Sequence, residues 1–134
     1  MISVLDTSVV MRLFIADGPL PPEIEPLLAD AQRGSHRLIA PQLMLAEVVN
    51  VLRRRTQLAE INAAEGEQIL QCILELPITL FDHAKLVQDA YELALAHRLS
   101  GYDSLFLALA RQHNARLYSC DEKLLEVAQE LRLG

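Results

Sequence analysis

Four short apolar segments alternate with longer segments of mixed polarity along this chain. Each segment is short and mostly apolar and precedes a residue that commonly starts a helix, a pattern typical of buried strands. The predicted strands are residues 2–5, 37–40, 78–81 and 116–119, and Pro41 is expected to end the second. Strands that alternate with helices predict an α/β fold in which helices cover both faces of a parallel sheet.

Helical spacing and end signals mark the segments between the strands. Asn62 and Glu65 have the spacing of a capping box, which predicts a helix that runs to about Leu76. Asp121 stands at the expected N-cap of the last helix. Another helix is predicted by apolar residues at the spacing of one buried helical face, namely Tyr102, Leu105, Phe106, Leu109 and Ala110.

The length and composition of the chain favour one domain. Residues 1–134 contain no repeat, low-complexity tract or linker, and 51% hydrophobic with 22% charged residues is an ordinary globular composition. The first residues lack the basic and apolar parts of a signal peptide, and no apolar stretch approaches the roughly 18 residues of a membrane span. We therefore expect a single cytoplasmic domain without a membrane anchor.

Charge and ligand spacing narrow the possible chemistry. A net charge of −6 argues against a generic nucleic-acid binder, which usually carries a basic face. Two divalent ions bound to acidic ligands would bring this charge to about −2, so composition leaves nucleic-acid binding open. Cys72 and Cys120 stand in unrelated contexts, so no disulfide is expected. The His and Cys residues lack the spacing of a zinc site, and glycine-rich nucleotide-binding motifs are absent.

Two acids stand at the ends of predicted strands. Asp6 directly follows the first strand, and Asp121 lies two residues beyond the apolar part of the fourth. Open α/β sheets bind ligands at the carboxyl ends of their strands, where the strand order reverses. Both acids therefore reach one crevice if these two strands are neighbours. The alternative is that each is only the N-cap of the helix it precedes.

Two further acids belong to predicted helices. Glu47 lies among Leu, Met and Val residues, where a carboxylate is costly unless it is paired or binds a metal. Asn50 and Arg54 follow on the same helical face, so association with Arg54, or simple exposure, is the alternative for Glu47. Asp103 lies in the first turn of its helix, where acids are also common for structural reasons.

Convergence of these four acids would have a chemical consequence. Each carboxylate would raise the pKa of the others, and a bound divalent cation would relieve their repulsion. Ligation by oxygen alone selects Mg²⁺ or Mn²⁺ over Zn²⁺. The sequence therefore predicts a site for one or two such ions.

Four local motifs follow one another along nearly the whole chain: VLDTS at 4–8, AEVVNVL at 46–52, LSGYDSLFLALA at 99–110 and LYSCD at 117–121. Together they resemble the motifs of PIN-domain ribonucleases, especially bacterial and archaeal VapC-type toxins. The third motif is close to the family signature L-S-x-Y-D-A-x-Y-L-A-L-A and is the most specific match.

The resemblance implies a PIN-like, Rossmann-like three-layer fold with four to five parallel strands. It also implies a metal-dependent endoribonuclease that cleaves tRNA, mRNA or rRNA to 5′-phosphate and 3′-hydroxyl ends, with an antitoxin partner and a homodimeric state. Carried over residue by residue, the implied metal-site acids are Asp6, Glu47, Asp103 and Asp121, and the implied polar helpers are Ser8, Asn50 and Ser119. Ser119 takes the place usually held by Thr, where its hydroxyl could orient Asp121.

Several points depart from the family or stay open. Only residues 131–134 follow the last predicted helix, so the usual fifth strand is short or absent. Glu47 is either a metal ligand or the base that takes a proton from water. Arg53 and Arg54 are candidate phosphate contacts, with a solvated basic helix end as the alternative.

Two other interpretations compete with a nuclease. A degenerate PIN domain would bind RNA or protein without catalysis, although all four acids are present here. A receiver domain also has an acidic Mg²⁺ pocket, but it needs a paired acid after the first strand, where this chain has Asp6-Thr7.

Overall fold

A four-stranded parallel sheet forms the centre of the computed structural model, which describes residues 1–134. The strands are β1 (Ile2–Leu5), β2 (Arg37–Pro41), β3 (Ile78–Phe81) and β4 (Arg116–Tyr118), arranged in the order β3-β2-β1-β4. All three pairings are parallel, which confirms the predicted α/β class and the position of each strand.

Two strand ends differ from the prediction. β2 includes Pro41, which pairs in register with Phe81. Proline has no N–H to donate, but the next residue, Gln42, donates to the Phe81 carbonyl at 2.9 Å. The backbone hydrogen bonding between β2 and β3 therefore continues beyond the proline. β4 ends at Tyr118, which leaves Ser119 outside the strand.

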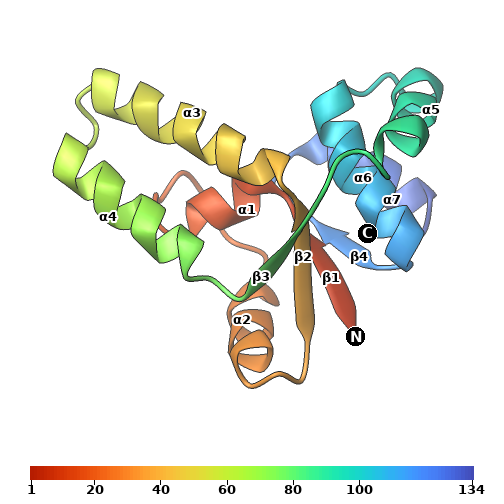
Figure 1. The fold of residues 1–134 in the computed structure, drawn as a ribbon, viewed down its shortest axis with the longest axis horizontal. Coiled ribbons are helices and arrows are strands. Elements are labelled where there is room, and N and C mark those ends of the chain that lie inside the picture. The colour runs from red at the N-terminus through yellow and green to blue at the C-terminus, as the bar shows by residue number, and fades with distance from the viewer.

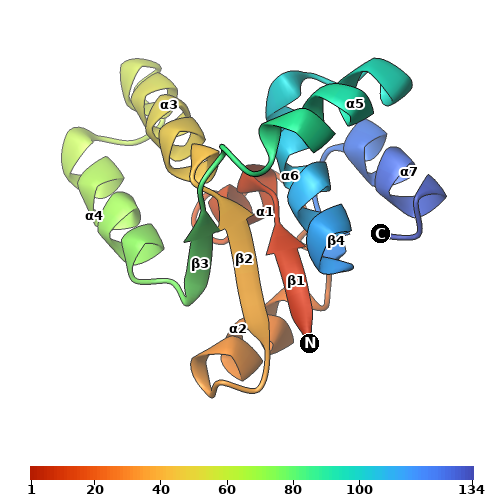
Figure 2. The same cartoon turned by 45° about the vertical axis from the view of Figure 1, so that its right-hand side comes forward.

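Seven helices surround the sheet: α1 (Thr7–Arg12), α2 (Ile24–Gln32), α3 (Leu43–Gln57), α4 (Ala63–Leu74), α5 (Val87–His97), α6 (Gly101–His113) and α7 (Glu122–Glu130). Figure 2 shows α6 in front of the sheet, α5 beyond the arrowhead ends of the strands, and α1 and α2 behind the sheet. α5 packs against α6. The α3–α4 hairpin forms one lobe of the molecule and α5, α6 and α7 form the other (Figure 1). The arrowheads of the strands point to the region between these lobes, which places the carboxyl edge of the sheet there.

Burial on α6 is wider than the sequence pattern predicts. Every residue from Ser104 to Ala110 is buried, because the sheet, α5 and α7 all pack against this helix. Tyr102 is 64% exposed, so its predicted place on the buried face is wrong. It lies in the first turn of α6, before the stretch that the neighbouring elements enclose.

The predicted N-terminal caps of α4 and α7 are confirmed. Asn62 and Glu65 form a reciprocal capping box at the start of α4, which ends at Leu74, two residues earlier than expected. The Asp121 carboxylate accepts the Leu124 N–H at 3.1 Å and caps α7. Both N-terminal caps depend on hydrogen bonds between residues three apart, which is why sequence spacing reveals them.

The C-terminal residues form no fifth strand. The Leu133 carbonyl accepts the Leu117 N–H at 2.6 Å, so the tail meets the open edge of β4 at a single point. Cys72 and Cys120 are unpaired thiols. None of the helices combines the length and the apolar character needed to cross a membrane.

Candidate active site

The strand order creates a switch point beside β1. The chain runs outward from β1 to β2 and β3, then returns through α5 and α6 to place β4 on the other side of β1. β1 and β4 are therefore neighbours, and the acids that follow them, Asp6 and Asp121, lie at the same edge of the sheet. This is the position at which open α/β sheets bind their ligands.

A cavity of about 350 Å³ opens at this edge. All four predicted acids line it, and they come from four different parts of the chain: the ends of β1 and β4 and the helices α3 and α6. The complete lining is Asp6, Thr7, Ser8, Met11, Arg12, Asp17, Glu47, Val51, Arg54, Arg55, Asp103 and Asp121.

Asp6 is the most buried of these acids, with 6% of its surface exposed. Its Oδ1 atom accepts the N–H of Thr7 at 2.9 Å, and its Oδ2 atom accepts the hydroxyls of Ser8 and Ser119, each at 2.7 Å. Burial raises the pKa of Asp6, and the nearby Asp121 charge adds to this, while the three hydrogen bonds oppose the rise. The carboxylate is held in one orientation at the floor of the cavity.

The two serine hydroxyls connect Asp6 to the chain after β4. The Cys120 N–H donates to Ser8 Oγ, and the Asp121 N–H donates to Ser119 Oγ, each at 3.0 Å. Each hydroxyl accepts from one backbone amide and donates its proton to Asp6. Ser119 thus contacts the backbone N–H of Asp121, while its hydroxyl donates to the Asp6 carboxylate and not to that of Asp121.

Glu47 projects from α3 toward Asp6 and is half-buried. The Thr7 hydroxyl donates to Glu47 Oε1 at 2.7 Å. Burial raises the pKa of Glu47, and the Asp6 and Asp103 charges raise it further against the effect of the Thr7 hydrogen bond. No ion pair forms between Glu47 and Arg54, so the alternative based on that pair does not hold.

Thr7 is a site residue that the sequence reasoning missed. It follows Asp6 directly and is buried, and its hydroxyl reaches a glutamate 40 positions away. A hydroxyl residue beside a strand-end acid is a weak signal, because the partner is defined only when α1 packs against α3.

Asp103 and Asp121 are the other two acids that line the cavity. Asp103 lies in the first turn of α6, where its N–H donates to the N-cap Ser100 hydroxyl at 3.0 Å. Burial raises the pKa of Asp103, and the charges of Asp6 and Asp121 raise it further. The hydrogen bond with Ser100 and the charge of Lys123 oppose the rise. Asp121 is exposed at the mouth of the cavity and also caps α7.

Three predicted residues are absent from the lining of this cavity. Ser119 is buried and donates to Asp6, whereas Asn50 and Arg53 do not contact the acids. Asn50 is exposed and is absent from the lining, because Glu47, Val51 and Arg54 occupy the face of α3 that turns toward the acids. Arg53 points to the groove between α3 and α4, where it donates to Gln57. Of the two arginines proposed as phosphate contacts, only Arg54 lines the cavity.

The donors of the site suit a hard divalent cation. No His or Cys side chain lines the cavity, and the available ligands are carboxylate oxygens, the type that Mg²⁺ and Mn²⁺ prefer. Burial is the main cause of the raised pKa values of Asp6, Glu47 and Asp103, and the charges of neighbouring acids raise these pKa values further. A bound cation would favour the ionised form of all three. As the side chains stand, no three of them have the spacing needed to share one ion.

A Rossmann-like parallel sheet with a carboxylate-lined cavity at its switch point is the arrangement expected of a PIN-like domain. The family profile of the PIN domain matches residues 3–130. The chain therefore belongs to the PIN domain family, and the suspected resemblance is confirmed.

Its full-length relatives carry ribonuclease names. A VapC ribonuclease from Mycobacterium bovis and ribonuclease VapC9 from Mycobacterium tuberculosis are each 29% identical over 126 residues, which cover 94% of this chain and 91% of theirs. Ribonuclease VapC3 from Pyrobaculum aerophilum is 26% identical, over 92% of each chain. The crystal structure of VapC20 from Mycobacterium tuberculosis, described as a sarcin–ricin loop cleaving toxin, superposes with a TM-score of 0.64. It covers 95% of each chain at 19% identity, so it supports the fold.

Proposed function

We propose that this chain is a metal-dependent endoribonuclease that hydrolyses RNA phosphodiester bonds, and that it is the toxin of a VapBC-type toxin–antitoxin pair. The observation that carries the proposal is the meeting of Asp6, Glu47, Asp103 and Asp121 in one cavity at the switch point of the sheet. The ribonuclease names of the full-length relatives support the same reaction.

The four acids would hold one or two Mg²⁺ or Mn²⁺ ions. Such ions, when bound, lower the pKa of water and neutralise charge that develops on a phosphoryl group. Asp6 is already directed by three hydrogen bonds, so it supplies a fixed ligand. Glu47 and Asp103 are half-buried, and their carboxylates accept at most one hydrogen bond each. They are therefore the side chains that can turn to close the ligand set.

Glu47 acts either as a metal ligand or as the base of the reaction. Thr7 occupies its Oε1 atom, which leaves Oε2 as the atom that either ligates the ion or takes a proton from the attacking water. A raised pKa suits the role of base, because it brings the carboxylate closer to the pH at which proton transfer is balanced. The products are expected to carry 5′-phosphate and 3′-hydroxyl ends.

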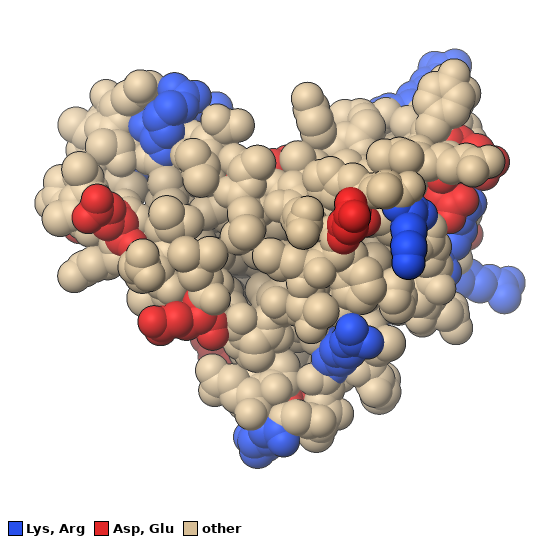
Figure 3. All heavy atoms as spheres, in the orientation of Figure 1, with Lys and Arg blue, Asp and Glu red and all other residues tan.

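A toxin of this type also needs protein partners. Val87, Tyr91 and Leu95 recur every four residues along α5 and are 52%, 68% and 65% exposed. Exposed apolar stripes commonly mark protein interfaces, which supports a homodimer or an antitoxin contact on this lobe. Figure 3 shows wide uncharged areas on the visible face, while acidic and basic side chains lie close together at its right-hand side.

The test is cleavage of a labelled structured RNA with Mn²⁺, beside an EDTA control and an Asp103→Asn variant. We expect Mn²⁺-dependent cleavage to disappear in the variant. The matched control is Asp82→Asn, since Asp82 is an exposed acid after β3 that lies outside the cavity and accepts only the Ala84 N–H. This control should keep full activity.

Two results would count against the proposal. Equal cleavage by the wild type and Asp103→Asn would point to a contaminating ribonuclease. Absence of both cleavage and Mn²⁺ binding by calorimetry would leave the adapter interpretation, in which a degenerate PIN domain binds RNA or protein without catalysis.

A further inference from the structure

Three consecutive arginines near the end of α3 line two different surfaces. Arg53 donates to Gln57 Oε1 at 2.9 Å and lines the groove toward α4. Arg54 and Arg55 both line the acidic cavity. A run that looks like one basic patch in the sequence therefore contributes only two side chains to the site.

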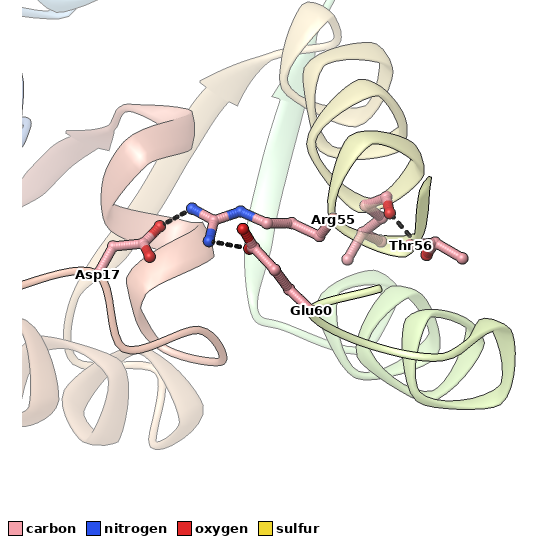
Figure 4. Close-up of polar contacts among 5 residues, drawn as sticks. Asp17, Arg55, Thr56 and Glu60 are labelled. Atoms are coloured by element: carbon pink, nitrogen blue, oxygen red, sulfur yellow. Dashed lines mark hydrogen bonds and ion pairs between the residues drawn. The ribbon is translucent and has the colours of Figure 1, made fainter. Parts of the chain in front are cut away.

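Arg55 adds no free charge to the cavity. Its guanidinium is paired with Asp17 from the loop after α1 and with Glu60 from the loop before α4, as Figure 4 shows. Its side chain is 21% exposed. Two carboxylates compensate its one positive charge, so Arg55 connects the two loops and is not available to bind an anion.

Arg54 keeps its charge uncompensated. It is exposed on the cavity side of α3, and no carboxylate lies within 4.0 Å of its guanidinium. Its neighbours on either side in the sequence are engaged elsewhere, and it retains all of its donors.

Arg12 is a second uncompensated cation on the lining. It is the last residue of α1, it makes no ion pair, and its Nη1 atom donates to the Pro19 carbonyl at 3.0 Å. Gly18 leaves room for it, since a Cβ atom at that position would lie 3.1 Å from Arg12 Cζ. The loop thus positions one side of this guanidinium and leaves its other donors for a ligand.

We propose that Arg12 and Arg54 form a subsite for an RNA backbone phosphate next to the scissile one. The inference rests on the proposed ribonuclease function and concerns how that site holds its substrate. Four acids repel RNA unless cations compensate them, and an ion held by those acids serves the reacting phosphate. A neighbouring phosphate needs its own positive partner, and a guanidinium matches phosphate oxygens through paired donors.

The experiment measures RNA binding separately from cleavage. A fluorescein-labelled 20-nucleotide single-stranded RNA of mixed sequence is titrated with the Asp103→Asn protein, by anisotropy, at several salt concentrations. Contact with a phosphate is independent of sequence, so the natural target need not be known. Arg54→Ala and Arg12→Ala are compared with Arg53→Ala, which removes the same charge from the same helix outside the cavity.

We expect Arg54→Ala and Arg12→Ala each to weaken binding roughly tenfold, as loss of a charge-assisted hydrogen bond does. Each should also reduce the slope of log K against log salt by about 0.7, the value for one phosphate contact on a single strand. Arg53→Ala should stay within about twofold of its parent. In the active protein, Arg54→Ala should raise KM with little change in kcat.

Several outcomes would overturn the subsite. An equal loss of affinity in Arg53→Ala would show a diffuse charge effect, and unchanged binding in Arg54→Ala and Arg12→Ala would show no contact. Lack of any RNA binding by the parent at low salt would also overturn it. Cleavage by the wild type together with unchanged binding in these variants would refute the subsite alone. Loss of binding in a protein that never cleaves would refute the nuclease and keep the subsite.

Discussion

The Ser119 hydroxyl offers the sharpest test of how the acidic site is held. It donates to the buried Asp6 carboxylate at 2.7 Å and accepts the Asp121 N–H at 3.0 Å. Ser119→Ala removes a hydrogen bond to a charged group and leaves the amide without its acceptor. Such a loss costs about 2 kcal/mol. For a chain of this length, that lowers the melting temperature by about 7 °C at neutral pH.

The effect of Ser119→Ala should depend on pH in a defined direction. Burial already raises the pKa of Asp6 above its usual 3.8, so the stability that Asp6 contributes is complete below that value and is lost as pH rises through the folded pKa. The Ser119 hydrogen bond opposes this loss by favouring the ionised form. Its removal raises the pKa further, so the variant should lose more stability than the wild type as pH increases. Below the folded pKa, Asp6 is neutral, so the difference between the two proteins should narrow to the part that the unpaired Asp121 N–H causes.

The assay is thermal and urea unfolding of both proteins in EDTA between pH 4 and pH 8. Ser119→Thr is the control, because it keeps a hydroxyl at the position and should retain most of the stability. A difference between Ser119→Ala and the wild type that stays constant across this pH range would refute the reasoning, since it would show a packing effect unrelated to the Asp6 charge. A constant loss in Ser119→Thr as well would point to the same conclusion.

The remaining predictions concern metal binding and the core. Mn²⁺ at about 100 times its Kd should add about 2.7 kcal/mol of stability, which raises the melting temperature by about 10 °C. Asp103→Asn should lose most of this metal-dependent shift, and an unchanged melting temperature in the wild type would contradict the metal site. Ser104→Ala should stabilise the protein by about 1 kcal/mol in urea unfolding, because the buried Ser104 hydroxyl has no hydrogen-bond partner. A loss of stability in this variant would show that the hydroxyl is satisfied in solution.

The neighbourhood of each residue along the chain was enough to place the four strands and several of the helices. The four strands are short, mostly apolar runs, and the capping box of α4 and the cap of α7 join residues three apart. Asp6 and Asp121 could be assigned to one edge of the sheet because parallel strands present their carboxyl ends together. Glu47 stood out as a charge among apolar neighbours.

Contacts between distant segments could not be read in this way. The hydroxyl of Thr7 meets Glu47 across 40 positions, and Ser119 meets Asp6 across 113. Both contacts depend on which strand lies beside β1 and on how α1 packs against α3. Short-range periodicity specifies neither of these, so the hydrogen-bond network of the site could not be predicted from the sequence.

The surroundings of the arginines and of Tyr102 also could not be predicted from the sequence. Helical spacing predicts the face on which a residue lies, but it does not say whether that face meets a wall of the cavity, another helix or solvent. Arg53 and Arg54 differ by one step of α3 and reach different surfaces. The sequence by itself determined the fold class and pointed to the four acids that line the cavity, because these follow from local periodicity, strand-end positions and the family motifs. Only the tertiary structure decided which hydroxyls orient those acids and which cations remain free, because these depend on the packing of segments far apart in the chain.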